Sequence, residues 1–388
     1  MNKVCEKKKI IRITTVPVSL NVLLKGQLAF MNQFYKVIGV STYEEHHFSE
    51  IKNREHIELV SLTLTRTISP LKDLIALYKL YFFLKKEKPF IVHSHTPKAG
   101  TIGMIAAKLA GVPHRFHTIA GLPLLESKGA KRKLLNLVEK ITYSCATKIL
   151  PNSIGLKEII VENKFTNANK LRVIANGSSN GIDCIHYDAS LFFEDEKISL
   201  KENLGISSKD FVFIFVGRLV GDKGINELVK SFKGLSTDVE NVKLLLVGPF
   251  ENNLDPLKKN TIEEIDSNNK IIAVGAQKDV RPYFAIANVL VFPSYREGFP
   301  NVVMQAGAMG LPSIVTNING CNEIIIEGEN GLIIPVKNIE LLYQAMIKIL
   351  NEKDEYRIMS QKSRDLVVKR YEQKYVWEQL LKEYQSLI

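Results

Sequence analysis

The segment FVFIFVGRLVGDKGINEL (residues 211–228) decides the fold that we predict for this chain. It passes from an unbroken run of β-branched and aromatic residues, through a loop, into a stretch with helical spacing. Apolar runs this short and continuous are typical of strands buried on both faces, as in a parallel sheet covered by helices. Glycines at the end of the strand (Gly217) and at the start of the helix (Gly224) allow the backbone to approach a ligand closely.

The same alternation of short apolar runs and longer amphipathic stretches continues on both sides of this segment. The earlier runs are KIIRITT, YKVIGVS, ELVSLTL, PFIVHSH, HRFHTIA, TKILPNS and LRVIANG, and the later ones are VKLLLVG, NKIIAVG, NVLVFPS, PSIVTN and GLIIPV. The pattern starts again at residue 211, and the 388 residues exceed what one hydrophobic core usually supports. The sequence therefore predicts two consecutive doubly wound, Rossmann-like α/β domains.

The junction between these domains lies in ANGSSNGIDCIHYDASLFFEDEKISL (residues 175–200), which is rich in Gly, Ser, Asn and acidic residues and lacks helical spacing. We place the boundary at residue 184, which gives domains 1–184 and 185–370. Residues 371–388 have a helical pattern and contain the only tryptophan, Trp377. Ligands of such sheets bind outside the carboxyl ends of the strands, so we expect functional residues directly after the apolar runs, in the cleft where the two domains face each other.

The charge of the chain is unevenly distributed. The formal net charge is +11, but residues 1–184 carry 28 basic and 13 acidic side chains, whereas the remaining 204 carry 24 and 28. The N-terminal half should favour anionic partners such as a cytoplasmic membrane face or a lipid-linked phosphate. A basic surface that serves only solubility is an equally good interpretation. No zinc knuckle, RNP-like strand or sequence-reading basic helix indicates nucleic acid.

Cysteine usage and the apolar segments point to the reducing cytoplasm. Cys5, Cys145, Cys184 and Cys321 are widely spaced, so neither a zinc site nor a disulfide framework is indicated. The basic N-terminus passes directly into an apolar run, without the pattern of a secretory leader. The stretch LKDLIALYKLYFFLKKEKP (residues 71–89) is interrupted by charges and predicts an amphipathic helix instead of a membrane span.

The first group of candidate residues follows the strand at 211–216. Gly217, Arg218, Lys223 and the predicted helix start together suit a diphosphate, because they combine a close backbone approach, free N–H groups and two cations. The GxxxxGK[ST] order of a Walker loop is absent. Alternatively, Arg218 and Lys223 are solvated surface cations.

The second group lies in SYREGFPNVVMQAGAMGLP (residues 294–312). We expect Pro300 at the first helical position and the amides of Gly298, Phe299 and Asn301 at the exposed N-terminus of that helix. Glu297 precedes the helix and Gln305 lies in its second turn, so the two could contact separate parts of one elongated ligand. For Glu297 the alternative is a carboxylate that stabilises the helix dipole, and for Gln305 it is a polar side chain at a helix edge.

The third group lies in the N-terminal domain. VHSHTPKAG places His93, His95 and Lys98 at a strand end, and RFHTIAGLP places His117 at the next. The His-X-His pair lacks a third ligand at metal-binding spacing, so we predict acceptor binding or hydrogen bonding instead of a metal site. His93 is best interpreted as a hydrogen-bonded core histidine.

Several motifs are missing from the sequence. It has no GxSxG elbow, no GxGxxG after the first strand, where only Gly26 stands in VPVSLNVLLKGQL, and no D-x-D at a strand end. These absences weigh against a hydrolase, a nicotinamide oxidoreductase and a metal-dependent inverting transferase.

In VGRLVGDKG, SYREGFPNVVMQAGAMGLPSIVTNINGCNEII, NGIDCIHYD, HSHTPKAGTIGMIAAKLAG and HTIAGLP, the chain resembles the retaining glycosyltransferases of family four, over nearly its whole length. The resemblance implies the GT-B fold, in which two Rossmann-like domains face each other across a cleft. It also implies an N-terminal acceptor-binding domain, a C-terminal domain for the nucleotide sugar, and a last helix, 371–388, that crosses back to the first domain. The motifs HSHTPKAGTIGMIAAKLAG and HTIAGLP are similar to those of enzymes that extend undecaprenyl-diphosphate-linked sugars.

The resemblance also assigns roles to residues. Arg218 and Lys223 would hold the diphosphate, Glu297 would bind the donor sugar as the first acid of an E-x(7)-E motif, and His117 would lie near the reaction centre. Gln305 stands where the second acid would contact the ribose. The remaining donor-binding positions implied are Gly217, Gly298, Phe299, Pro300 and Asn301, and the acceptor-binding positions are Gly26, His95 and Lys98.

The function implied is a metal-independent retaining transfer of a hexose or N-acetylhexosamine from a nucleotide sugar, with UDP expected, to a polyprenyl-diphosphate-linked saccharide. No cofactor is expected beyond the nucleotide sugar itself. The enzyme would act in the cytoplasm, in peripheral contact with the anionic inner face of the membrane. Two alternatives are a nucleotide-sugar-binding subunit without catalysis, which Gln305 prompts, and a sugar-nucleotide epimerase of the same architecture.

Overall fold

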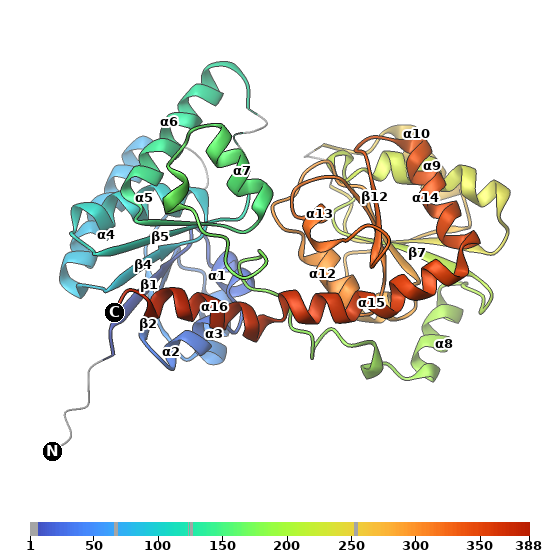
Figure 1. The fold of residues 1–388 in the computed structure, drawn as a ribbon, viewed down its shortest axis with the longest axis horizontal. Coiled ribbons are helices and arrows are strands. Elements are labelled where there is room, and N and C mark those ends of the chain that lie inside the picture. The colour runs from blue at the N-terminus through green and yellow to red at the C-terminus, as the bar shows by residue number, and fades with distance from the viewer. Residues whose placement is uncertain (1–6, 66–68, 123, 125–126, 252–254) are drawn as a thin grey trace. The chain divides into compact units, whose positions relative to one another are not determined.

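The computed structural model describes residues 7–65, 69–122, 124, 127–251 and 255–388. The chain forms two compact units (Figure 1). The first runs to Gly181 and includes the last segment, Gln373–Ile388, whereas the second is Ile182–Glu372. Each unit is an α/β domain built on one six-stranded parallel sheet, which confirms the two predicted α/β domains. The run LRVIANG (residues 171–177) is an exception, because it forms no strand and only its Leu171 makes an isolated bridge, to Ile149.

The sheet of the first unit has the order β3-β2-β1-β4-β5-β6, with every neighbouring pair parallel. Its strands are β1 (Lys9–Ile13), β2 (Lys36–Ser41), β3 (Glu58–Ser61), β4 (Ile91–Ser94), β5 (His114–Ile119) and β6 (Lys148–Pro151). Its helices are α1 (Pro17–Leu23), α2 (Gln27–Asn32), α3 (Glu45–Glu55), α4 (Pro70–Glu87), α5 (Pro97–Leu109), α6 (Gly129–Cys145), α7 (Ile154–Glu162) and α16 (Gln373–Gln385).

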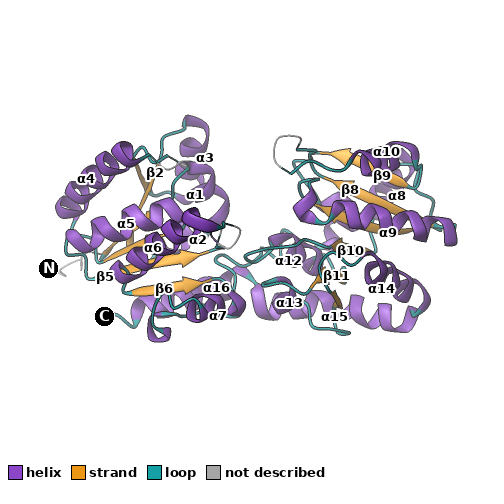
Figure 2. Cartoon of the chain, turned by 90° about the horizontal axis from the view of Figure 1, so that it is seen from above, coloured by secondary structure: helices purple, strands orange, loops and turns teal. Residues whose placement is uncertain are grey.

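Both faces of this sheet are buried, because successive side chains of a strand point to opposite faces. Ile11 and Ile13 of β1 belong to the core beneath α4, α5 and α6, whereas Ile10 belongs to the core beneath α1, α2 and α16. In Figure 2 the helices α4, α5 and α6 lie side by side in one layer, and α5 packs against both of the others.

The C-terminal helix α16 completes the second of these cores. Leu380, Leu381 and Tyr384 are buried in it. The Tyr384 hydroxyl lies 2.5 Å from Nδ1 of His93, whose Nε2 lies 2.7 Å from the Thr118 hydroxyl. His93 is thus fully hydrogen-bonded in the core, which confirms the interpretation of its place on the strand.

The second unit repeats the topology, with strand order β12-β11-β10-β7-β8-β9. Its strands are β7 (Phe211–Val216), β8 (Val242–Val247), β9 (Ile271–Gly275), β10 (Val289–Phe292), β11 (Ser313–Thr316) and β12 (Gly331–Ile334). Its helices are α8 (Glu194–Asn203), α9 (Ile225–Asp238), α10 (Lys259–Ser267), α11 (Arg281–Ala285), α12 (Asn301–Ala308), α13 (Cys321–Ile324), α14 (Ile339–Asn351) and α15 (Lys353–Tyr371).

In each sheet the first strand is central, and the chain winds to one edge before it returns to wind to the other. The point of reversal lies between β1 and β4 in the first unit and between β7 and β10 in the second. Ligands of doubly wound sheets bind at such a point, outside the carboxyl ends of the strands. The strand order therefore predicts a ligand site at the loops that follow β7 and β10.

The apolar stretch at residues 71–89 forms most of α4, which confirms the predicted helix, but apolar side chains lie on its exposed side as well as on its buried side. Within the residues described, none of the helices has both the length and the apolar composition needed to cross a bilayer. Cys145, Cys184 and Cys321 are buried and unpaired with one another, whereas Cys5 lies outside the described residues.

Candidate active site

The loops after β7 and β10 pack directly against each other in the second unit. Gly224, the residue before α9, has φ +73°, and a Cβ there would lie 2.2 Å from the carbonyl oxygen of Pro293. Only glycine tolerates both the left-handed backbone and this approach. The two loops therefore hold the ends of β7 and β10 in a fixed arrangement.

This arrangement brings Lys223 and Glu297, which lie 74 residues apart in sequence, into direct contact through the Lys223 ammonium and Glu297 Oε1. Both side chains are largely buried, with 17% and 16% exposed. The buried hydroxyl of Ser294 donates to the same Oε1 atom over 2.9 Å, and Thr316 in turn donates to the carbonyl oxygen of Ser294. The carboxylate is thus held in one place by a cation and a hydroxyl.

Neither Lys223 nor Glu297 has the simpler role that sequence left open for it. Lys223 is not a solvated surface cation, because it is paired and largely buried. Glu297 precedes α12 by four positions and bonds to a lysine and a serine side chain. Sequence reasoning named both residues for one ligand without predicting that they would contact each other.

Arg218 has a different partner from Lys223. Its guanidinium contacts the carboxylate of Glu251 at 2.5 Å, and the side chain is nearly half exposed. The expected role of Arg218 in holding a diphosphate stays a prediction. Arg218 follows Gly217, whose N–H donates to the Val247 carbonyl at the end of β8 over 2.9 Å.

The segment from Gly298 to Asn301 is held by its backbone. Asn319 donates to the carbonyl oxygens of Glu297 and Gly298 over 2.7 and 2.8 Å. The Phe299 side chain is buried, so any ligand contact from it must come from its main chain. Helix α12 begins at Asn301, and Pro300 caps it from outside, which corrects by one position the expectation that Pro300 is the first helical residue.

Gln305 has a partner that sequence reasoning missed. Its amide nitrogen donates to the Tyr187 hydroxyl over 2.8 Å, across 118 positions of sequence. Burial is the main cause that raises the pKa of Tyr187, so this hydroxyl stays protonated and can both accept and donate. Gln305 is therefore a bonded side chain facing the junction segment, not an isolated polar group at a helix edge.

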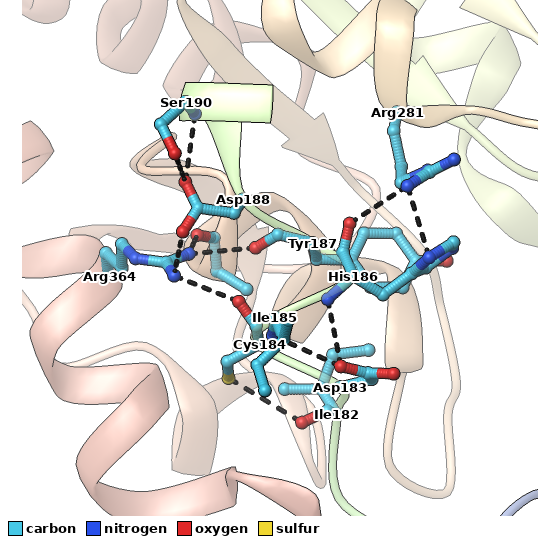
Figure 3. Close-up of polar contacts among 11 residues, drawn as sticks. Ile182, Asp183, Cys184, Ile185, His186, Tyr187, Asp188, Ser190, Arg281 and Arg364 are labelled. Atoms are coloured by element: carbon cyan, nitrogen blue, oxygen red, sulfur yellow. Dashed lines mark hydrogen bonds and ion pairs between the residues drawn. The ribbon is translucent and has the colours of Figure 1, made fainter. Parts of the chain in front are cut away.

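The segment that carries Tyr187 is fixed by two arginines, which Figure 3 shows. Arg364 donates to the carbonyl oxygens of Cys184 and Tyr187 over 2.9 and 2.8 Å and pairs with Asp188 at 2.6 Å. Arg281 donates to the carbonyl oxygen of His186 over 3.1 Å. The junction stretch NGIDCIHYD, whose role the sequence left unspecified, thus places an aromatic hydroxyl against α12.

In the first unit, His117 is buried, with 3% exposed, and lies within β5 instead of beyond its end. Its Nδ1 lies 2.9 Å from the Ser94 hydroxyl. A Cβ on Gly100 of α5 would lie 2.3 Å from the ring, so the helix covers the imidazole closely. Burial lowers the pKa of His117 to about 4, so the ring is neutral at pH 7.

The other candidates of the first unit also have partners within it. Nε2 of the buried His95 accepts from the Arg12 guanidinium over 2.9 Å, and Lys98 pairs with Asp73 at 2.5 Å. Gly26 has φ +78°, and a Cβ there would lie 2.6 Å from the Trp377 ring of α16. These contacts account for each residue structurally, so their roles in acceptor binding stay predictions.

Comparison with known proteins agrees with this architecture. Residues 196–366 match the family described as glycosyl transferases group 1, and residues 36–177 match the glycosyl transferase 4-like domain. The chain is 32% identical to a capsular polysaccharide biosynthesis glycosyltransferase, CapM, of Staphylococcus aureus, over 99% of this chain and 98% of that protein.

Two further proteins extend the comparison. An Escherichia coli UDP-Gal:alpha-D-GlcNAc-diphosphoundecaprenol alpha-1,3-galactosyltransferase is 32% identical over 79% of this chain and 78% of its own. The crystal structure of Anabaena HepE in complex with UDP superposes with a TM-score of 0.79 at 17% identity, covering 98% of this chain and all of that one. Two doubly wound domains of this kind define the GT-B class of glycosyltransferases. Within that class, the chain belongs to the group 1 glycosyl transferases, of the family-four type that its motifs resemble.

Proposed function

We propose that this glycosyltransferase moves a hexose or N-acetylhexosamine from a UDP-sugar to a polyprenyl-diphosphate-linked saccharide during surface polysaccharide assembly, with retention of configuration. The observation that carries the proposal is the contact of Lys223 with Glu297 at the point of sheet reversal. The names of relatives support the substrates. The name of the Escherichia coli relative gives UDP-Gal as donor and a diphosphoundecaprenol-linked acceptor. A 28% identical Campylobacter jejuni relative is an N,N'-diacetylbacillosaminyl-diphospho-undecaprenol alpha-1,3-N-acetylgalactosaminyltransferase.

In this proposal the bound donor replaces the carboxylates that pair with Lys223 and Arg218 in the structure. The diphosphate takes Lys223, and Arg218 leaves Glu251 to join it, so that two cations stabilise the charge on the departing group. The released Glu297 carboxylate accepts hydrogen bonds from sugar hydroxyls. Main-chain N–H groups between Gly298 and Asn301 contact the sugar and the phosphate. Because side-chain cations supply the positive charge, we expect transfer to be independent of added divalent metal.

The nucleoside end is assigned to Gln305 and Tyr187. An amide can accept a hydrogen bond from a ribose hydroxyl, as the carboxylate of the family motif would, and the Tyr187 hydroxyl fixes its orientation. Gly217 lies at the end of β7, where its small size leaves room for the nucleotide.

Proton removal from the acceptor is assigned to the departing phosphate oxygen, on the same face of the sugar. His117 matches the family histidine by motif, but its ring is buried beneath α5 and has a lowered pKa. A ring that is buried and has a lowered pKa is a poor base, so the proposal does not depend on it.

The acceptor is assigned to the first unit because that unit carries the positive charge. We propose that the lipid-linked diphosphate and the anionic inner face of the membrane are both drawn to it. His95 and Lys98 would contact the acceptor only after leaving Arg12 and Asp73, and Gly26 would contact it through its main chain.

The test is a transfer assay with a panel of nucleotide sugars, chosen by the thermal shift each gives on binding, and with an undecaprenyl-diphosphate-linked acceptor. We expect transfer that survives EDTA and a product with the anomeric configuration of the donor, read by NMR. Glu297→Ala should lower the rate by at least about 100-fold. Donor binding without turnover would instead identify a binding subunit, and an epimerised donor without acceptor would identify an epimerase. A preference for GDP- or ADP-sugars would overturn the UDP assignment.

A further inference from the structure

Helix α4 exposes an apolar face to solvent. Five large side chains project from it with between 51% and 79% of their surface exposed: Leu71, Leu74, Ile75, Tyr78 and Phe82. Their spacing of three and four residues places them on one side of the helix. The opposite side, with Ala76, Leu80 and Leu84, is buried in the core. The outward face of α4 is therefore apolar where a solvent-facing helix is normally polar.

The polar residues on the exposed surface of α4 are cationic. The lysines exposed there are Lys72, Lys79, Lys85 and Lys86. The two acidic residues of α4 are occupied elsewhere, since Asp73 pairs with Lys98 at 2.5 Å and Glu87 pairs with Lys9 at 3.0 Å. Over the whole of α4, which the structure describes, no acidic side chain is fully exposed.

Helix α6 has the same character. Leu134, Leu137 and Ile141 are between 41% and 55% exposed at spacings of three and four. The lysines exposed beside them are Lys131, Lys133 and Lys140. The acidic residue of α6, Glu139, is largely enclosed, and burial raises its pKa. Both helices pack against α5 and belong to one layer of the first unit (Figure 2).

We propose that these exposed apolar and lysine residues of α4 and α6, the α4–α6 face, dock on the surface of an anionic lipid bilayer. The apolar side chains would enter the boundary between headgroups and acyl chains, and the lysines would lie among lipid phosphates. A second copy of the chain is a poorer occupant, because a symmetric contact would bring two rows of lysines together. A bilayer offers an apolar interior to the exposed apolar side chains and anionic phosphates to the lysines.

The inference rests on the proposed function, because a lipid-linked acceptor requires the enzyme to work at a membrane. It adds to that function by naming the helices that make the contact. The basic stretch KGAKRK (residues 128–133) supplies charge at the start of α6, but the apolar side chains that would insert lie further along α6 and on α4.

The test is sedimentation of the full-length protein with vesicles of phosphatidylglycerol and phosphatidylethanolamine, compared with vesicles of phosphatidylcholine alone. Replacing Leu74, Ile75 and Tyr78 together by serine should weaken binding to the anionic vesicles by about tenfold or more for each residue that inserts deeply. Lys72→Gln with Lys79→Gln should weaken it by roughly fivefold per lysine at low salt.

The matched control is Phe193→Ser with Ile198→Ser. These side chains are as exposed as those of α4 but lie beside the acidic residues 194–196 in the second unit. This control should bind vesicles as the unaltered protein does. Circular dichroism shows that each variant is folded, and sedimentation velocity without lipid tests self-association.

The outcomes separate the surface from the reaction. Three results would refute the proposal that the α4–α6 face binds the bilayer. They are equal vesicle binding by the serine variant and the unaltered protein, vesicle binding that does not depend on lipid charge, and loss of a dimer in the serine variant without loss of vesicle binding. Transfer to a water-soluble acceptor analogue should be unchanged in the serine variant. If the unaltered protein transfers no sugar but loses vesicle binding on substitution, the surface stands and the proposed function fails.

Discussion

Gln305→Glu restores the carboxylate of the family motif, and we expect it to tighten UDP binding. In the structure the Gln305 amide donates to the Tyr187 hydroxyl over 2.8 Å. A carboxylate cannot donate, but the hydroxyl can rotate and donate to it instead, so the contact survives the change. In the proposed function, the other carboxylate oxygen would then contact the ribose in place of the amide.

The expected gain follows from the two kinds of hydrogen bond. A bond to a charged group contributes about 1.5 to 3 kcal/mol and a neutral one about 0.5 to 1.5 kcal/mol, a difference of about 1 kcal/mol. Gln305 is half-buried, so part of this gain is offset by the cost of desolvating the new charge. We expect UDP to bind up to roughly fivefold more tightly.

The assay is isothermal titration calorimetry of UDP with the unaltered protein, Gln305→Glu, Gln305→Ala and Tyr187→Phe. A UDP analogue without the ribose 2′- and 3′-hydroxyls is the matched control, and its affinity should not respond to Gln305→Glu. Tyr187→Phe should reduce the gain, because the carboxylate loses the donor that orients it. The reasoning is refuted if Gln305→Glu weakens UDP binding in a folded protein, or if the analogue shows the same gain.

Three further predictions concern stability. Gly224→Ala should lower the free energy of unfolding by about 3 kcal/mol or more, because its methyl group would meet the Pro293 carbonyl. Gly205 is also at positive φ but has open space around it, so Gly205→Ala should lower the free energy of unfolding by only about 1 kcal/mol. Denaturant unfolding followed by circular dichroism compares the two variants. At acid pH His117 is neutral in the folded protein and protonated in the unfolded protein. Its contribution to the free energy of unfolding should therefore fall by about 3 kcal/mol between pH 6.5 and pH 4. A His117→Gln variant should lose stability less steeply over that range. Tyr384→Phe should lower the free energy of unfolding by about 1 to 3 kcal/mol, because it leaves a buried nitrogen of His93 without a hydrogen bond. The fluorescence of the only tryptophan, which lies in the same helix, can follow this unfolding. A change near zero would contradict the hydrogen bond.

The sequence predicted features that depend on neighbouring residues. Burial on both faces leaves a continuous apolar run, so the strands around residues 211–216 and 289–292 could be recognised, and the restart of the pattern indicated a second sheet. Helix limits were predicted to within a few residues, as with the start of α12. The choice of Glu297 and Lys223 also came from local patterns, namely a polar residue between a strand and a helix.

Contacts between distant segments could not be predicted in this way. Tyr187 and Gln305 meet because the junction segment folds back onto α12, and nothing near either residue specifies the other. The burial of His117, by contrast, left a signal. It lies in a strand whose last four residues, Phe116 to Ile119, are all buried, and Gly100 in the neighbouring helix provides the space for its ring. Taking the strand as doubly buried through Ile119 would have predicted an enclosed imidazole.

The contact between Lys223 and Glu297 gives the site a property that neither residue has alone. With no donor bound, each neutralises the other in a largely buried position, which avoids the cost of an isolated buried charge. In the function that we propose, a diphosphate would compete with Glu297 for the Lys223 ammonium group and, on binding, would release the Glu297 carboxylate beside the sugar. The carboxylate cannot move far, because Ser294 holds it from a loop that is fixed by the Gly224 contact with Pro293. Binding of the phosphates would therefore prepare the sugar subsite, and a nucleotide lacking phosphate would leave it closed.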